Sequence, residues 1–271
     1  MHKSLIRVSV TAVLTLASML PMASQAQSVD DWQWRATVYA WFPSVSGQSR
    51  FPAGTGGSSV DINSDVVLDS LKFAFMGTLE AQKGRYGLWT DVIYLDLEGD
   101  KSGTREASIT RLAIPVGADL NANLQIKGWL WTIAGTYSVV QTPEHSMDVL
   151  LGARLLDVES RLNWQFTGNV GALPIAATGA SSIDQSLWDG IIGIKGRLSF
   201  GDDRKWFVPY YFDIGTGESD LTWQALVGVG YQFSWGAVTA AYRYLDYEFK
   251  TGKPMEDLNF SGPAIGLTFR W

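Results

Sequence analysis

Residues 221–235 read LTWQALVGVGYQFSW, and apolar residues occupy every second position from Leu221 to Trp235. The positions between them hold Thr, Gln, Gly and Ser, with Leu226 as the exception. Because successive side chains of a β-strand point to opposite faces, this alternation predicts a strand with one apolar face. Strands of soluble proteins usually have about five or six residues. An apolar face of about 9–11 residues with aromatic residues near its ends is typical of strands that cross a membrane.

The same alternation recurs along the chain and predicts ten strands, with eight or twelve as alternatives. The expected fold is all-β: a transmembrane antiparallel up-and-down β-barrel with apolar side chains outside and polar side chains inside. The expected strands are residues 32–42, 72–83, 86–98, 119–140, 147–165, 186–200, 205–216, 219–234, 237–250 and 258–271.

The connections between these segments alternate between short turns and longer loops, the longest being residues 43–71, 99–118 and 166–185. Since outer-membrane barrels have short periplasmic turns and longer outer loops, both termini are expected on the periplasmic side. Residues 58–62, within the first long connection, also fit a strand and would add to the strand count. The segments 119–140 and 147–165 exceed the length of a membrane strand, so their outer halves are expected to rise above the membrane as a paired wall.

The first 26 residues have the pattern of a secretory signal peptide. Lys3 and Arg7 precede an apolar stretch at residues 8–22, and small residues at 23–26 suit cleavage after Ala26. The apolar stretch is short for a spanning helix, which needs about 20 residues. We therefore expect a signal peptide at residues 1–26 and an outer-membrane barrel at residues 27–271.

The composition argues against several functional classes. The chain contains no Cys and only two His, so thiolate metal sites, Cys nucleophiles and His-rich metal sites are not expected. Its 27 acidic and 21 basic residues give a formal charge of −6, which does not favour nucleic acid as a partner. His145 and Ser146 are adjacent, so on a strand they would point to opposite faces, and the Gly-x-Ser-x-Gly motif of hydrolases is absent. We expect no enzymatic activity, no cofactor and no metal site.

The C-terminal residues 262–271, GPAIGLTFRW, alternate in character and end on an aromatic residue. They resemble the C-terminal assembly signal of bacterial outer-membrane β-barrel proteins, carried here by Ile265, Leu267, Phe269 and Trp271, with Trp271 in place of the more usual Phe. Residues 241–247, AYRYLDY, are similar to the penultimate strand of small porin-like barrels. Residues 71–80 and 84–96 resemble segments of uncharacterised proteins of the same class. The resemblance implies an integral protein of a Gram-negative outer membrane, insertion by the barrel assembly machinery, and contact with outer-membrane lipid and lipopolysaccharide.

Ten charged residues are expected to point into the barrel: Arg35, Glu80, Asp91, Arg154, Asp189, Lys195, Arg197, Asp213, Arg243 and Arg270. The assignment of Asp91 is the least regular, because Trp89, Ile93 and Leu95 share its face. Two interpretations are open. The charges form a constriction that selects solutes, or they neutralise one another as ion pairs that fill a narrow barrel.

The first functional hypothesis is therefore a porin-like protein that lets small solutes pass through a narrow polar lumen. The alternative is a non-conducting structural or surface-interaction barrel whose lumen is filled by ion pairs. The sequence leaves the solute and the oligomeric state open.

Overall fold

The computed structural model describes residues 31–49, 58–62, 70–104, 119–170, 173–251 and 255–271. The regular elements in this part of the chain are β-strands: β1 (Gln33–Trp41), β2 (Ser44–Ser49), β3 (Ser58–Ile62), β4 (Leu71–Lys83), β5 (Tyr86–Thr104), β6 (Asp119–Gln141), β7 (His145–Val170), β8 (Leu173–Phe200), β9 (Trp206–Gly217), β10 (Ser219–Gln232), β11 (Ala237–Phe249) and β12 (Met255–Arg270). Within these ranges no helix is long and apolar enough to cross a membrane. The expected signal peptide lies outside the described residues.

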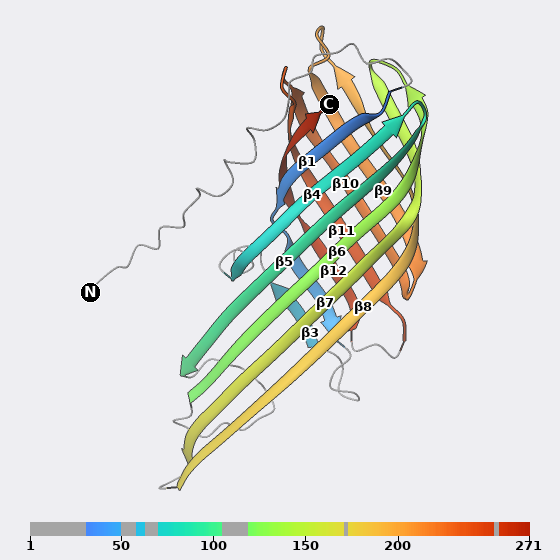
Figure 1. The fold of residues 1–271 in the computed structure, drawn as a ribbon. Helices are drawn as coiled ribbons and strands as arrows, with labels where there is room; N and C mark the ends of the chain where they lie inside the picture. Colours follow the sequence, from blue (N-terminus) through green and yellow to red (C-terminus); the bar gives the residue numbers. More distant parts are fainter. Residues whose placement is uncertain (1–30, 50–57, 63–69, 105–118, 171–172, 252–254) are drawn as a thin grey trace, which may run out of the picture.

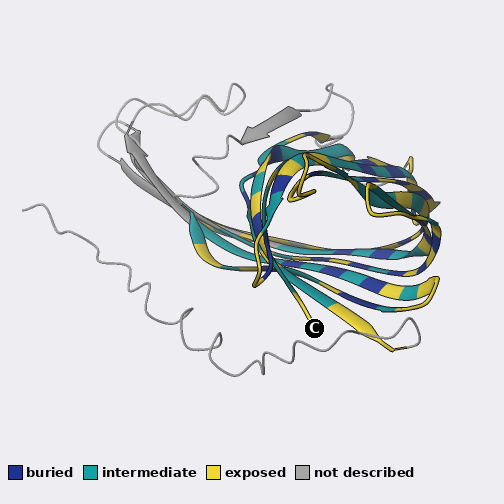
Figure 2. Cartoon of the chain, turned by 90° about the horizontal axis from the view of Figure 1, so that it is seen from above, coloured by how far each residue is buried: buried dark blue, intermediate teal, exposed yellow. Residues whose placement is uncertain are grey.

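Ten of the strands form a closed antiparallel barrel (Figures 1 and 2). They follow one another around the ring from β1 through β4 to β12, and β12 pairs back with β1. Two backbone hydrogen bonds between Trp34 and Trp271, of 2.9 and 3.1 Å, help to close the seam. The predicted all-β barrel and its ten strands are confirmed.

The first long connection is not wholly a loop. After Pro43 the chain continues as β2, which pairs with the outer part of β12, and β3 then pairs with β2. Residues 58–62, which the sequence left ambiguous, thus form a strand that lies beside the barrel ring and is not part of it. The remaining loop residues 50–57 and 63–69 are outside the described part.

The four strands β5, β6, β7 and β8 are much longer than the others and extend past the rest of the barrel (Figure 1). The loop expected at residues 166–185 was wrong, because β7 and β8 stay paired from His145 opposite Leu198 to Val170 opposite Leu173. The part of the loop expected at residues 99–118 that is described, residues 99–104, continues β5 along β6. The projecting wall predicted from two strands therefore contains four, and we call this part of β5–β8 the outer sheet.

The outward face of β7 marks where the apolar belt ends. Val149 and Leu151 are exposed, with 39% and 71% of their surface accessible, and belong to the belt. Further along the same face the residues become polar, from Asp157 through Glu159 to Arg161. Because charged side chains avoid hydrocarbon, this change places the membrane boundary near Asp157 and the outer sheet beyond it.

Aromatic side chains gather at both ends of the apolar belt. Towards the outer sheet, Tyr94 contacts both Phe73 and Trp129, with ring centroids 5.9 and 4.5 Å apart. Near the short turns, Tyr86 contacts Tyr137 at 5.2 Å. Further contacts extend the two bands through Trp131 with Trp188, Trp223 with Tyr244, Trp206 with Tyr231, and Trp235 with Phe269. Two such bands are the aromatic girdles of a membrane barrel.

The four residues of the expected assembly signal lie on the outward face of β12. Ile265, Leu267 and Trp271 are exposed, and Phe269 is partly buried against Trp235. They sit on the strand that closes the barrel against β1. Their role in recognition by the barrel assembly machinery stays a prediction.

Candidate functional site: the barrel interior

Arg154 points from β7 into the barrel and has no accessible surface. Its guanidinium forms an ion pair with Asp213 of β9, which is equally buried. It also donates hydrogen bonds to the hydroxyl oxygens of Thr132 (3.2 Å) and Thr222 (3.3 Å), and Tyr211 donates its hydroxyl hydrogen to Asp213. Four strands, β6, β7, β9 and β10, therefore meet at one arginine inside the barrel.

A second network surrounds Arg243 of β11. Its guanidinium pairs with Asp91 of β5 at 2.8 Å and donates to the Gln224 side-chain oxygen at 2.9 Å. It also donates to the Tyr39 hydroxyl oxygen at 2.7 Å, and that hydroxyl donates onward to Asp91 at 2.6 Å. The guanidinium lies 4.9 Å from the centre of the Trp41 ring, within cation–π range. The ambiguity of Asp91 is thus resolved: its side chain is buried and paired inside the barrel.

A third group lies next to the short turns. Glu80 is shared by Arg35 and Lys195, at 2.8 and 2.6 Å. Here a pocket of about 140 Å³ opens, lined mainly by polar residues that include Arg35, Glu80 and Arg270. We call this pocket the inner mouth of the barrel.

The other three predicted inward charges have partners of a different kind. Asp189 accepts a hydrogen bond from the backbone N–H of Ser219 at 2.9 Å. Arg197 lies over the ring of Phe207 at 5.3 Å, and Arg270 donates to Gln232. The structure thus brings seven of the ten predicted residues together in three ion-paired groups and leaves these three in separate contacts.

The interior is not polar throughout, and this corrects the expected polar-in pattern. Between the charged networks and the outer sheet, nine buried hydrophobic residues form one cluster: Trp41, Met76, Ile93, Leu130, Leu156, Leu187, Leu245, Tyr247 and Phe249. They come from seven of the ten barrel strands, β1, β4 to β8 and β11, and occupy inward positions. A narrow barrel fills its interior with side chains, and here apolar ones fill the half nearer the outer sheet. We call this cluster the apolar plug.

Every barrel strand contributes a residue that helps to fill the interior around the charged networks. Around the networks and the adjoining edge of the apolar plug, each barrel strand contributes one inward residue: Tyr39, Met76, Asp91, Thr132, Arg154, Asp189, Asp213, Gln224, Arg243 and Gly262. Nine are buried and Tyr39 is partly buried. Figure 2, which views the barrel from above, shows buried, intermediate and exposed residues following one another along the strands. A water-filled passage would leave its lining accessible, so side chains occupy the interior at this level.

Glycine also helps to fill the interior. The backbone of Gly230 faces the ring of Phe207, and a Cβ at Gly230 would lie 2.2 Å from a ring carbon. Only a residue without a side chain allows this close approach. A neighbouring aromatic ring therefore covers this inward glycine.

The described residues contain no group of three or more His, Cys, Asp or Glu side chains that could hold a metal ion. The partners Tyr39, Tyr211, Thr132, Thr222 and Gln224 were not predicted from sequence. Their inward position follows from the strand alternation, but the level at which they meet Arg154 and Arg243 does not.

A closed antiparallel barrel with an apolar outer belt between two aromatic girdles defines an outer-membrane β-barrel protein. No protein-family model matches the chain, and no curated protein sequence is detectably similar to it.

Among solved structures, the chain is similar to the outer membrane protease OmpT from Escherichia coli, with a TM-score of 0.52 and 8% identity over 92% of this chain and 99% of OmpT. Ail, the attachment invasion locus protein of Yersinia pestis, matches with a TM-score of 0.30 and 10% identity over 89% of this chain and 99% of Ail. A Pseudomonas aeruginosa FadL homologue matches with a TM-score of 0.30 and 9% identity over 89% of this chain and 90% of the homologue. The likeness to OmpT concerns the fold and supports an integral outer-membrane barrel.

Proposed function

We propose that this chain is a non-conducting outer-membrane barrel that anchors the outer sheet at the cell surface. The observation that carries the proposal is that inward residues around Arg154 and Arg243 are buried on nine of the ten barrel strands and partly buried, at Tyr39, on the tenth. Of the two functional hypotheses drawn from the sequence, this burial favours the barrel filled by ion pairs.

The chemistry of the filling also supports a closed interior. A selective channel keeps its charged or carbonyl groups available to the passing solute. Here the carboxylates of Asp91 and Asp213 are already bonded to arginines and tyrosines within the protein. Above them, the apolar plug is mostly hydrocarbon, and a single hydroxyl such as that of Tyr247 cannot replace the hydration shell of an ion. An ion would have to break buried pairs and then enter hydrocarbon-like surroundings, and both steps are costly.

The outer sheet is the part of the molecule suited to contact with aqueous partners. Its β7–β8 pairing continues for many residues beyond the apolar belt, and polar side chains are exposed on it. Arg161, Asn163 and Gln165 on β7 share a face with Ser182 on β8, which lies opposite Arg161. A rigid sheet held by backbone hydrogen bonds presents such groups in fixed positions, which lowers the entropic cost of binding.

One observation favours porin-like passage of small solutes as a second candidate. The inner mouth is polar and is lined by Arg35, Glu80 and Arg270, and Lys195 also pairs with Glu80. A solute path would begin there. On the proposed account, this path ends at the Arg154 and Arg243 networks.

Electrical recording distinguishes the two candidates. The refolded full chain is inserted into planar bilayers, and insertion is verified by heat-modifiable migration of protein recovered from the membrane. We expect no stepwise current, with a general porin in the same bilayers as the positive control. Reproducible current steps from the folded wild type would refute the closed barrel and favour passive passage.

A further inference from the structure

The barrel wall is interrupted between β1 and β4. Their backbone pairing runs from Gln33 opposite Gln82 to Val38 opposite Gly77 and stops there. On the other sides, β1 stays paired with β12 as far as Trp41, and β4 stays paired with β5 as far as Leu71. Within the described residues, the facing edges of β1 after Tyr39 and of β4 before Met76 have no strand pairing between them.

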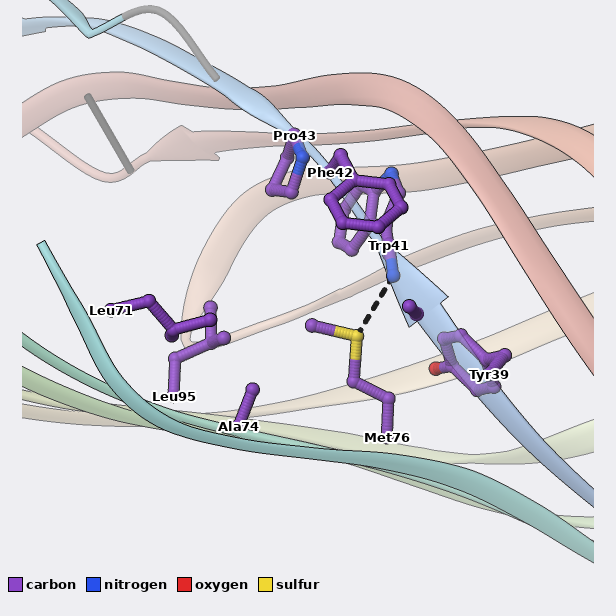
Figure 3. Close-up of a pocket in the computed structure, with 9 residues that line it drawn as sticks. Tyr39, Trp41, Phe42, Pro43, Leu71, Ala74, Met76 and Leu95 are labelled. Carbon is purple, nitrogen blue, oxygen red and sulfur yellow. Dashed lines mark hydrogen bonds between the residues drawn. The ribbon is translucent and has the colours of Figure 1, made fainter. Parts of the chain in front are cut away.

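A side chain replaces the missing backbone partner at one point. The backbone N–H of Trp41 donates to the sulfur of Met76 at 3.2 Å, as Figure 3 shows. A thioether sulfur is only a weak acceptor. Open sheet edges are not stable against hydrocarbon unless they line a cavity or are covered, so this interruption needs an explanation.

The interruption contains a pocket of about 120 Å³. In Figure 3, Leu71, Leu95, Ala74 and Met76 lie on one side of it and Tyr39, Trp41, Phe42 and Pro43 on the other. The lining crosses the wall, since Phe42 continues the outward face of β1 whereas Trp41 and Met76 belong to the apolar plug. The lining therefore includes side chains from both faces of the wall.

The height of the pocket places it within the membrane. On β4 the neighbouring outward residues Phe73 and Phe75 are 56% and 50% exposed and belong to the apolar belt. Phe73 also contacts Tyr94 of the girdle towards the outer sheet. The pocket thus lies at the height of the bilayer half that is nearer the outer sheet.

The lining determines what can occupy the pocket. The side chains around it are mostly apolar. The Tyr39 hydroxyl already bonds Asp91 and Arg243, and the indole N–H of Trp41 already donates to the Gly262 carbonyl oxygen at 3.2 Å. Water needs two to four polar partners, so it is a poor occupant. An empty gap would forfeit dispersion contacts on all its walls. The volume approaches that of the cavity of about 150 Å³ that takes benzene in another protein, so a few methylene groups fit.

We propose that the gap between β1 and β4 binds an acyl chain of a lipid from the surrounding membrane. The lipid's chain enters sideways between Phe42 and Ala74 and ends against Trp41, Met76 and Leu95. Its headgroup stays at the girdle marked by Phe73. This site goes beyond the proposed function, because a barrel closed along its axis can still be open to lipid through its wall.

The test uses the full chain folded in vesicles that contain a phosphatidylcholine with a photoactivatable diazirine in one acyl chain. After illumination, mass spectrometry locates the labels. We expect labels on the inward residues Met76 or Leu95 as well as on Ile265, which faces lipid on β12. Absence of label on both inward residues, in a sample where Ile265 is labelled, would overturn the proposal.

Two variants of equal size control the experiment. Ala74→Trp fills the pocket and should abolish the inward labels while leaving Ile265 labelled. Ala240→Trp adds the same bulk to an exposed position on β11 and should change neither. If Ala74→Trp does not fold, judged by heat-modifiable migration, Leu95→Phe takes its place.

Unchanged inward labelling in a folded pocket-filling variant would contradict the site. Inward labels from a free diazirine alkane but none from the lipid would also overturn it, in favour of a small hydrocarbon.

Discussion

Replacing Arg154 with methionine is expected to lower the free energy of unfolding by about 3–5 kcal/mol, because it leaves a buried carboxylate without its counter-ion. Asp213 and Arg154 have no accessible surface, and Asp213 keeps only the Tyr211 hydroxyl as a hydrogen-bond donor after the change. Urea titration of the barrel refolded in lipid vesicles, followed by tryptophan fluorescence, measures the loss.

A double variant and an exposed pair provide the controls. Arg154→Met combined with Asp213→Leu removes both charges and should recover most of the stability, since apolar replacement of a buried pair is often neutral. Arg204→Ala breaks a pair with Glu144 of 2.7 Å in which both side chains are more than half exposed. It should cost less than about 1 kcal/mol. A loss of that small size for Arg154→Met would mean that water reaches the pair.

Replacing Val227 with arginine is expected to cost about 2–4 kcal/mol, the penalty for a charge near the middle of the lipid face of a barrel. Val227 lies mid-strand on the outward face of β10, with 57% of its surface exposed. In water, so exposed a position would tolerate a charge. On the lipid face the same exposure places the charge in hydrocarbon, which is unfavourable. The same urea titration in vesicles measures the effect.

Position and not charge alone should decide this outcome. Ser234→Arg introduces the same side chain in an exposed turn at the end of the barrel, where the penalty falls to about 0–1 kcal/mol. Val227→Leu keeps the apolar character and should be close to neutral. Equal tolerance of arginine at Val227 and Ser234 would show that the outward face of β10 does not contact lipid.

The strands that cross the membrane were predictable because their two faces lie in different environments, which produces the alternation of apolar and polar residues. In β10 the outward residues face lipid and the inward residues face the interior, and the expected segment 219–234 differs from β10 only at its end. The short turns were predictable for a different reason, which is the backbone freedom of glycine. Gly84 and Gly201, with φ of 58° and 85°, supply the left-handed backbone conformation that a tight turn needs.

Only two of the four strands of the outer sheet were predicted, because small residues weaken the alternation of apolar and polar positions in the others. Residues 176–182, AATGASS, have no distinct apolar face, and they were expected to form a loop. In the structure they pair with β7 across the whole stretch. Their strand conformation comes from the backbone hydrogen bonds of a neighbour, which a single sequence does not encode locally.

The filled interior could be predicted only in part. Alternation identified the inward charges but not which of them meet, since Arg154 and Asp213 are 59 residues apart. Inward apolar residues such as Ile93 and Leu130 look in the sequence like lipid-facing ones. The apolar plug therefore became visible only when the ten strands were brought together.

The accessibility of the interior to a small ion tests the closed barrel most directly. The chain has no cysteine, so Thr132→Cys places a single thiol beside Arg154, at a site that is 1% exposed. The folded variant is treated with Ag⁺, and the remaining free thiol is titrated after unfolding. Ser234→Cys in the exposed turn is the reactive reference, and treatment in urea is the control for both. We expect the Thr132→Cys thiol to survive in the folded barrel and to be consumed only in urea. Consumption in the folded state at a rate near that of Ser234→Cys would contradict the closed interior.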